Sequence, residues 1–279
     1  FRLFRNILEN FYVTIWAPGR TGRFQRTIKC PITATGVFNL GLFKDVFNCV
    51  NSLVKSIYVD PEIIASLFPF LNENYNKNII SVPNQKYKYF PEQNNAIEKL
   101  LKIGRGIVIS PCSSGKSLII AGLLLNITNK SKIPINHSLI IVPTRQLVTQ
   151  LYKDFCDYGL KSEVEQFTSG EIHSRKSKFI ISNRQWLEKH FKELPSISCV
   201  IVDECHVLKS QNKCSKFVNS IETNLKFGFT ATLPNNKFDE YTIKGIIGPI
   251  VAKYHFSDIQ QSRKIVDVKL NNLYFHFTT

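Results

Sequence analysis

Lys116 and Ser117 are the first residues that could do chemistry. They follow Gly115 in a turn of small residues, between the β-prone run 107–109 and the apolar segment SLIIAGLLL. A strand end, a tight turn and a helix start present backbone N–H groups and a helix dipole that favour a phosphate. We expect Lys116 to contact the β- and γ-phosphates of a nucleotide, and the Ser117 hydroxyl to bind Mg²⁺.

Ser110 stands where the phosphate-binding motif G-x-x-x-x-G-K-[S/T] has its first glycine. Serine is small enough for this outer position of the turn. The alternative is a serine-rich corner between a strand and a helix that holds no nucleotide. If the turn binds a nucleotide, the contacting residues are Pro111, Ser113, Ser114, Gly115, Lys116 and Ser117.

Two adjacent carboxylates follow a second apolar run. Asp203 and Glu204 come directly after residues 199–202, with His206 two positions further on. Carboxylates at the end of a buried strand are costly unless they have a partner. Asp203 suits a ligand that holds Mg²⁺ partly through water, and Glu204 suits a base that activates a water molecule. The alternative for a single Asp is an acidic helix N-cap.

A third run, FGFTATLP (227–234), ends in Thr230 and Thr232. Taken alone, Thr-Ala-Thr is a weak signal. Together with the lysine-tipped turn and the acidic pair, it gives three polar clusters on successive strand ends. Because the carboxyl ends of parallel strands meet at one edge of a sheet, these clusters are expected to converge.

The elements that must position these residues alternate from about residue 90. Strands are predicted at 107–109, 139–142, 179–181, 199–202 and 227–229, and helices at 92–102, 116–127, 145–157, 183–191, 213–222 and 238–246. Continuous apolar strands that alternate with helices predict an α/β fold, a parallel sheet covered by helices on both faces.

The first part of the chain has a different pattern. Residues 11–30 contain two β-prone runs around a Pro-Gly turn, which predicts a hairpin. Apolar residues at helical spacing predict an amphipathic helix over 39–57, and residues 56–61 suggest a further strand. This is a small α+β unit, and the polar run 72–78 marks its boundary.

Composition favours a globular protein with a polyanionic partner. The chain has 279 residues, 43% of them hydrophobic, and a formal net charge of +15. No apolar run is long enough for a membrane helix, and no segment resembles a secretory signal. The seven scattered cysteines favour reduced thiols in a cytoplasm, most of them as buried small apolar residues. The alternative for the charge is a generally lysine-rich surface.

In order, these motifs resemble those of the superfamily 2 helicases, the DExH/DEAD group. PCSSGKS is similar to their motif I, VPTRQLVTQ (142–150) to motif Ia, VDECH to motif II and TATL to motif III. FPEQNNAI (90–97) resembles the glutamine motif, with Gln93 as the adenine-recognising residue. The resemblance covers about residues 86–275 and implies a RecA-like domain that uses ATP and Mg²⁺.

The resemblance also implies how ATP and nucleic acid are coupled. Thr230 and Thr232 would contact His206, and five residues would contact a nucleic-acid backbone: Thr144, Arg145, Ser169, Gly170 and Asn183. A phosphodiester is bound well by a hydroxyl, a backbone N–H at a helix start and a cation. The sequence PTR at the start of a predicted helix offers all three, which agrees with a backbone contact. For Arg145 the alternative is a solvated residue on a helix surface.

Basic residues concentrate in the first 30 residues. Arg20, Arg23, Arg26 and Lys29 are predicted to contact a duplex backbone. Arg23 would share a strand face with alternate residues, and Arg26 would point the other way. Trp16 and Phe24 are expected in a hydrophobic core, with base stacking as the alternative.

We therefore expect a small α+β nucleic-acid-binding domain (1–75), a linker (76–89) and a first RecA-like ATP-binding helicase domain (90–279). The resemblance implies an ATP-dependent DNA helicase or translocase, monomeric and cytoplasmic, acting on branched or duplex DNA in phage recombination, repair or replication. The alternatives are an RNA helicase and a nucleic-acid-binding adaptor with a vestigial phosphate loop. No second RecA-like domain is found and the chain contains no methionine, so we expect a fragment with weak ATPase activity.

Overall fold

The computed structural model describes residues 2–18, 24–54, 58–62, 79–112, 114–131, 134–168, 177–210 and 212–255. Its main feature is a seven-stranded sheet with the order β5-β6-β4-β7-β8-β3-β9, in which every pair of neighbours is parallel. The strands are β3 (Arg105–Ile109), β4 (His137–Val142), β5 (Val164–Phe167), β6 (Phe179–Asn183), β7 (Ile197–Asp203), β8 (Leu225–Thr230) and β9 (Ile250–Lys253).

All five predicted strands are confirmed, and they form the centre of the sheet. The two strands that the sequence analysis missed, β5 and β9, are its edges. Each has four residues; polar residues interrupt the apolar pattern of β5, and β9 has only three apolar residues before Lys253. The predicted helices are confirmed within a few residues as α4 (Pro91–Ile103), α5 (Lys116–Lys130), α6 (Arg145–Asp157), α7 (Arg184–His190), α8 (Lys213–Ser220) and α9 (Lys237–Ile246).

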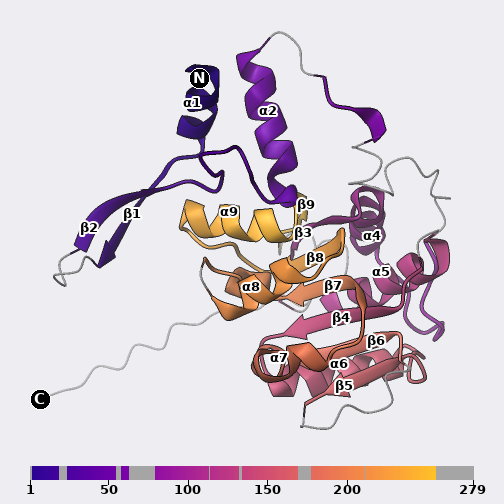
Figure 1. Ribbon diagram of the computed structural model, residues 1–279. Coiled ribbons are helices and arrows are strands. Elements are labelled where there is room, and N and C mark those ends of the chain that lie inside the picture. Colours follow the sequence, from indigo (N-terminus) through magenta and orange to yellow (C-terminus); the bar gives the residue numbers. More distant parts are fainter. Residues whose placement is uncertain are drawn as a thin grey trace, which may run out of the picture.

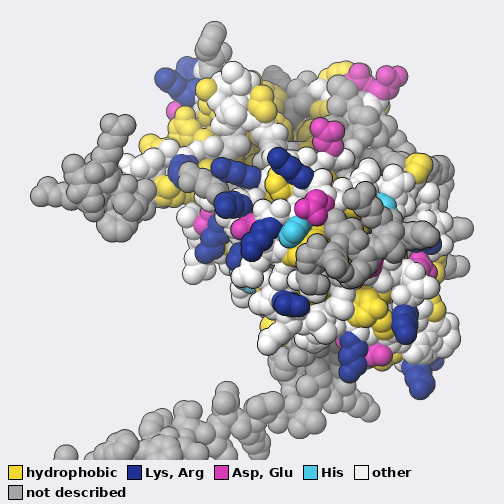
Figure 2. Space-filling view, turned by 60° about the horizontal axis from the view of Figure 1, so that its bottom comes forward, with side chains coloured by type: hydrophobic (Ala, Val, Ile, Leu, Met, Phe, Trp, Pro, Cys, Tyr) yellow, Lys and Arg dark blue, Asp and Glu magenta, His cyan; other side chains and the backbone are white. Residues whose placement is uncertain are grey.

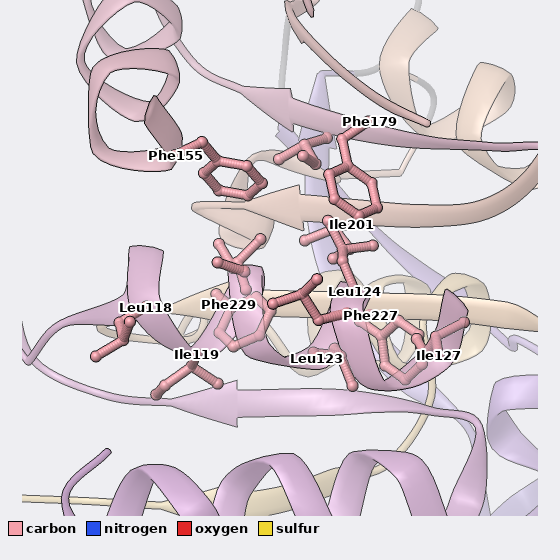
Figure 3. Packing of buried hydrophobic residues seen from close by; sticks show 14 of the residues in the cluster. Leu118, Ile119, Leu123, Leu124, Ile127, Phe155, Phe179, Ile201, Phe227 and Phe229 are labelled. Atoms are coloured by element: carbon pink, nitrogen blue, oxygen red, sulfur yellow. The ribbon is translucent and has the colours of Figure 1, made fainter. Parts of the chain in front are cut away.

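Alternate residues of β3, β4, β6 and β7 enter two separate hydrophobic clusters, one on each face of the sheet. Val108, Ile140 and Ile201 pack with α4, α5 and α6, whereas Ile107 and Leu139 pack with α7, α8 and α9. Figure 1 shows these two helical layers around the strands. On the first face, Phe155 of α6 lies against Phe179 of β6 with ring centroids 6.1 Å apart, as Figure 3 shows.

Strand order brings the predicted polar clusters together at the carboxyl ends of three neighbouring strands. β8 lies between β3 and β7, and the register pairs Ile109 with Thr230 and Asp203 with Phe229. All three strands point the same way, so the segments that follow them leave the sheet side by side. The expected convergence of the three clusters is confirmed.

The N-terminal unit contains α1 (Arg2–Asn10), the antiparallel strands β1 (Val13–Pro18) and β2 (Phe24–Lys29), the 3-10 helix η1 (Leu40–Leu42) and α2 (Phe43–Leu53). The predicted hairpin is confirmed, and the predicted helix over 39–57 is shorter; α1 was missed. The suggested strand at 56–61 is wrong where the structure describes it. Residues 58–60 are irregular, and the Asp60 carboxylate accepts a hydrogen bond from the Glu62 N–H at the start of a helical turn.

This N-terminal unit packs directly on α9, as Figure 1 shows. Gly41 of η1 lies so close to α9 that an added Cβ would meet the backbone of Lys244 and Gly245. The rings of Phe11 and Tyr241 are 5.6 Å apart. Backbone contact this close explains why glycine occupies position 41.

The predicted linker (76–89) is wrong over its described part. Ile80 exchanges backbone hydrogen bonds with the Asn126 side chain of α5, Val82 is fully buried, and the Asn84 amide donates to the Asp157 carbonyl of α6. This segment therefore belongs to the core of the larger domain. The polar run 72–78 lies outside the described residues, as does 264–275. Within the described residues, no helix combines the length and apolar character needed to cross a bilayer.

The cysteines are less buried than expected. Cys199, Cys205 and Cys214 are buried, Cys30, Cys49 and Cys156 are half-buried, and Cys112 is exposed. The interpretation of most of them as buried residues is therefore wrong. Cys199 lies in β7 and Cys205 two residues after its end, and burial raises the pKa of both thiols.

Candidate nucleotide-binding site

The turn after β3 has the backbone geometry of a phosphate loop. Gly115 has a left-handed conformation with φ of 75°, and α5 begins at the next residue. Ser110 is buried, and its N–H donates to the Thr230 carbonyl over 2.9 Å. Among the described residues Glu204 is the non-glycine residue with a positive φ, so Ser110 needs no glycine-like backbone. The serine at the first glycine position is therefore compatible with the loop.

Gln93 lies beneath this loop. Its side chain is only 1% exposed. Its amide nitrogen lies 3.2 Å from the Ser114 carbonyl and 3.4 Å from the Gly115 carbonyl, and its amide oxygen accepts from the Phe90 N–H. This geometry gives Gln93 a part in holding the loop, whereas adenine recognition by Gln93 stays a prediction.

Lys116 and Glu204 form an ion pair across the strand ends. The Lys116 Nζ is 2.9 Å from Glu204 Oε1, and the two side chains are 12% and 22% exposed. Glu204 follows β7 with a left-handed backbone, φ of 52°. Such a conformation is unfavourable for a residue with a Cβ, and it occurs most often where function requires a particular side-chain direction.

Asp203 lies beside this ion pair and is mostly buried. Burial raises the pKa of its carboxyl, and the nearby Lys116 charge opposes that shift. The Asp203 Oδ1 accepts a hydrogen bond from the Glu204 N–H over 3.0 Å. A desolvated carboxylate next to a single cation has strong affinity for a further positive charge.

Lys116, Ser117, Asp203 and Glu204 border one cavity of about 410 Å³. The opposite wall comes from α6, through a row of side chains that the sequence analysis did not select: Leu147, Gln150, Leu151 and Asp154. These positions share one face of a helix because they are three or four residues apart. A carboxylate at position 154, on the helix face that carries Leu147 and Leu151, was the available signal.

Ser117 is held from the α6 side. Its hydroxyl is 2.8 Å from the Tyr158 hydroxyl and also bonds to the Asp154 carboxylate. Burial raises the pKa of Tyr158 to about 12, so this phenol stays protonated at neutral pH. The Ser117 hydroxyl therefore has a defined orientation before any ligand binds.

These residues fit a magnesium nucleotide. The Ser117 hydroxyl and the Asp203 carboxylate are hard oxygen donors, which Mg²⁺ prefers, and few protein ligands suffice when phosphates and water complete its shell. Gly115 leaves space at the α5 N-terminus, where backbone N–H groups favour a phosphate. Among the described residues, no cluster of three or more His, Cys, Asp and Glu could hold a metal by itself.

Of the two predicted contacts with His206, the structure shows the one made by Thr230. His206 Nδ1 lies 2.9 Å from the Thr230 hydroxyl and 3.2 Å from Glu204 Oε2. Thr230 in turn bonds to the Thr232 carbonyl over 2.8 Å. The Thr232 side chain is exposed, and the described part of the chain gives its hydroxyl no hydrogen bond. The predicted contact between Thr232 and His206 therefore stays a prediction.

The predicted nucleic-acid residues differ in accessibility. Thr144 caps α6 through the Leu147 N–H, and both Thr144 and Arg145 are exposed at that helix start. Asn183 is buried, and its side chain caps α7 by accepting from the Trp186 N–H. The structure contradicts a backbone contact by the Asn183 side chain. Ser113, Ser169 and Gly170 lie outside the described residues.

The basic hairpin is described only in part. Arg26 is exposed on β2, and the Lys29 ammonium lies 5.1 Å from the ring centre of Phe238 on α9. Lys29 therefore also helps to hold the hairpin against the larger domain. Arg20 and Arg23 lie outside the described residues, and so do the side chains of Trp16 and Phe24.

A parallel sheet with a phosphate loop after one strand and an acidic pair after a neighbouring strand defines a RecA-like nucleotide-binding domain. Its motif order is that of the superfamily 2 helicases. Residues 86–235, more than half of the chain, match the family described as "Type III restriction enzyme, res subunit". The chain belongs to this family.

Individual relatives agree with this assignment. The chain is 28% identical over 192 residues to the "ATP-dependent DNA helicase uvsW" of Enterobacteria phage T4, which covers 66% of this chain and 38% of that protein. It is 23% identical over 239 residues to the "General transcription and DNA repair factor IIH helicase/translocase subunit XPB" of Schizosaccharomyces pombe, covering 76% and 28%. The chain thus spans well under half the length of these curated relatives.

Solved structures show the same fold. The crystal structure of the UvsW helicase from bacteriophage T4 matches with a TM-score of 0.65 and 22% identity, over 90% of this chain and 93% of that one. The Sulfolobus solfataricus SWI2/SNF2 ATPase core in complex with dsDNA matches with a TM-score of 0.53 and 16% identity, over 66% and 40%. The first likeness extends beyond the nucleotide-binding domain into the N-terminal unit.

Proposed function

We propose that this chain is the ATP-binding part of a DNA helicase or translocase that acts on branched or duplex DNA in recombination, repair or replication. The observation that carries the proposal is the meeting of Lys116, Asp203 and Glu204 around one cavity at the sheet edge. The curated relatives are named as a DNA helicase and as a helicase/translocase, which supports DNA as the substrate class.

In this proposal each residue at the site has a distinct part. Lys116 and the N–H groups at the α5 start bind phosphates, and Ser117 and Asp203 hold Mg²⁺, which neutralises phosphate charge when bound. Glu204 takes a proton from water. In the structure the Glu204 carboxylate forms an ion pair with Lys116. Binding of phosphate by Lys116 would weaken that ion pair and leave Glu204 as the base.

Glu204 also connects the site to motif III. Its second oxygen contacts His206, and His206 contacts the buried Thr230 hydroxyl. A change in the charge next to Glu204 can therefore affect Thr230, at the end of β8, through the contact of Glu204 with His206 and that of His206 with Thr230. We propose this chain of contacts as the link between nucleotide state and nucleic acid.

Contacts to DNA are proposed at the α6 start and on the N-terminal unit (1–75). Thr144 and Arg145 are exposed where N–H groups and a cation suit a phosphodiester. The net charge of +15 supports a polyanionic partner. Figure 2 shows one face on which Lys and Arg side chains outnumber acidic ones.

Nucleotide titration tests the proposal. The chain should bind ATP in a Mg²⁺-dependent way, and Lys116→Ala should abolish that binding. Lys178→Ala is the matched control, because Lys178 also forms an ion pair with a glutamate. Lys178 immediately precedes β6, and 52% of its side chain is exposed. Equal ATP binding by Lys116→Ala and the unmodified chain would show that this turn does not bind the phosphates. Absence of Mg²⁺-dependent binding from the unmodified chain would favour the adaptor with a vestigial loop.

The substrate class needs a second comparison, with the complete protein. ATP hydrolysis is measured with forked DNA, duplex DNA and RNA at one ionic strength, because salt alters backbone affinity. Stimulation by forked or duplex DNA is the expected result. Stimulation by RNA alone would replace the DNA helicase with an RNA helicase.

A further inference from the structure

Two buried cations lie side by side near the amino ends of β3 and β8, whereas the nucleotide site lies at the carboxyl ends of the strands. Arg105 begins β3 and Lys226 is its register partner on β8, whereas the phosphate loop and Thr230 follow the other ends of these strands. The two residues are only 4% and 5% exposed. Lys and Arg are rarely so buried without an acidic partner.

Backbone carbonyls explain part of this burial. Arg105 donates to the carbonyls of Ile246 and Ile247, at the end of α9, and Lys226 to those of Val218 and Asn219, at the end of α8. Both cations therefore cap helix C-termini, where positive charge is favourable. The carbonyls use only part of the donor capacity of each group.

Among the residues that the structure describes, these two positive charges have no counter-ion. Neither Arg105 nor Lys226 forms an ion pair within the described part of the chain. Burial, and then the charge of Arg105, lower the pKa of Lys226 to about 8, and burial lowers that of Arg105 to about 10. Two adjacent desolvated cations are therefore held at an electrostatic cost that an anion would reduce.

Both cations border one cavity of about 520 Å³. Its other walls are mostly polar and come from two parts of the fold: Asn39 precedes η1 of the N-terminal unit, Asn219 lies in the last turn of α8, and Thr223 follows that helix. The cavity also has one acidic side chain, the exposed Glu222. A polar cavity with two cations and amide groups suits an oxyanion that accepts several hydrogen bonds.

We propose that this cavity, between the N-terminal unit and the end of α8, binds a phosphate group through Arg105 and Lys226. The group belongs either to a free phosphorylated small molecule or to a nucleic-acid backbone; both sources share the same chemistry. The site is separate from the ATP site, and the proposal holds whether or not the chain hydrolyses ATP.

The site is tested by one substitution that adds a negative charge to the cavity wall and one that removes a negative charge. Both leave Arg105 and Lys226, which cap α9 and α8, in place. Asn219→Asp places a carboxylate next to Lys226, and Glu222→Gln removes one; both positions are exposed, so folding is preserved. Inorganic phosphate is titrated against chloride of equal ionic strength, and affinity is taken from the rise in Tm. All variants carry Lys116→Ala, which removes the ammonium group at the other sheet edge.

Asn219→Asp should weaken phosphate binding about tenfold, and Glu222→Gln should strengthen it roughly threefold, on the scale of charge-assisted hydrogen bonds. Gln185→Glu adds the same negative charge at the start of α7, on the opposite edge, and should have no effect. Equal phosphate affinity in the parent, Asn219→Asp and Glu222→Gln would overturn the proposal.

A duplex-DNA arm distinguishes the two sources of phosphate. Binding of a short duplex is measured for the same variants at the same ionic strength. A change in duplex affinity that parallels the change in phosphate affinity assigns the site to the nucleic-acid backbone. Unchanged duplex affinity, with altered phosphate affinity, assigns it to a free phosphorylated ligand.

Discussion

Replacement of Thr230 by valine should impair the proposed link between nucleotide and nucleic acid while leaving the residues that bind the nucleotide unchanged. The Thr230 side chain is fully buried. Its hydroxyl donates to the Thr232 carbonyl over 2.8 Å and lies 2.9 Å from His206 Nδ1. Valine keeps the shape of threonine and removes both hydrogen bonds, so a loss measures the hydroxyl and not a cavity.

The expected cost follows from these two bonds. A net hydrogen bond contributes about 1 kcal/mol, and an acceptor left without its partner costs about 1–3 kcal/mol. Both hydrogen bonds are only partly buried, so the loss of two net hydrogen bonds sets the cost. We expect Thr230→Val to lower the free energy of unfolding by about 1–3 kcal/mol.

Urea denaturation of the chain measures this loss, and Thr232→Val is the control. Thr232 is exposed and contributes its carbonyl, which valine retains, so its variant should stay within about 0.5 kcal/mol of the parent. In the complete protein, Thr230→Val should retain Mg-ATP affinity but lose most of the stimulation of ATP hydrolysis by DNA. Equal stability of the two variants, or full stimulation in Thr230→Val, would refute the reasoning.

Three further predictions follow from the site and its support. Tyr158→Phe removes the hydroxyl that holds Ser117; the Mg²⁺ needed for half-maximal ATP binding should rise about tenfold, with Mg²⁺-free binding unchanged. Burial raises the pKa of Asp203 above its ordinary 3.8, so its ionised form opposes folding as pH rises through the raised value. Asp203→Asn should therefore increase stability at pH 7 and leave it unchanged at pH 3, in urea titrations at both pH values. Gly41→Ala would press a Cβ against α9, 2.6 Å from the Gly245 carbonyl; limited proteolysis should detach residues 2–54 faster, by a destabilisation of about 1–3 kcal/mol.

Much of the motor domain could be predicted from local sequence. The central strands are continuous apolar runs and the helices have a clear period, so their places along the chain depend on neighbouring residues alone. The convergence of Lys116, Asp203 and Glu204 then follows, because residues after parallel strands share one edge of the sheet. The edge strands β5 and β9 were missed because each is short and exists through its pairing with β6 or β3.

Tertiary structure decided which polar residues meet. Asn183 belongs to a plausible motif, but its side chain caps α7 in the core. Tyr158 belongs to no motif, yet it reaches Ser117 from α6, a contact between residues far apart in sequence. Arg105 and Lys226 also belong to no motif, and strand order brings them together. Periodicity is set by neighbouring residues and is therefore present in the sequence, whereas the partners of a side chain depend on how separate elements pack.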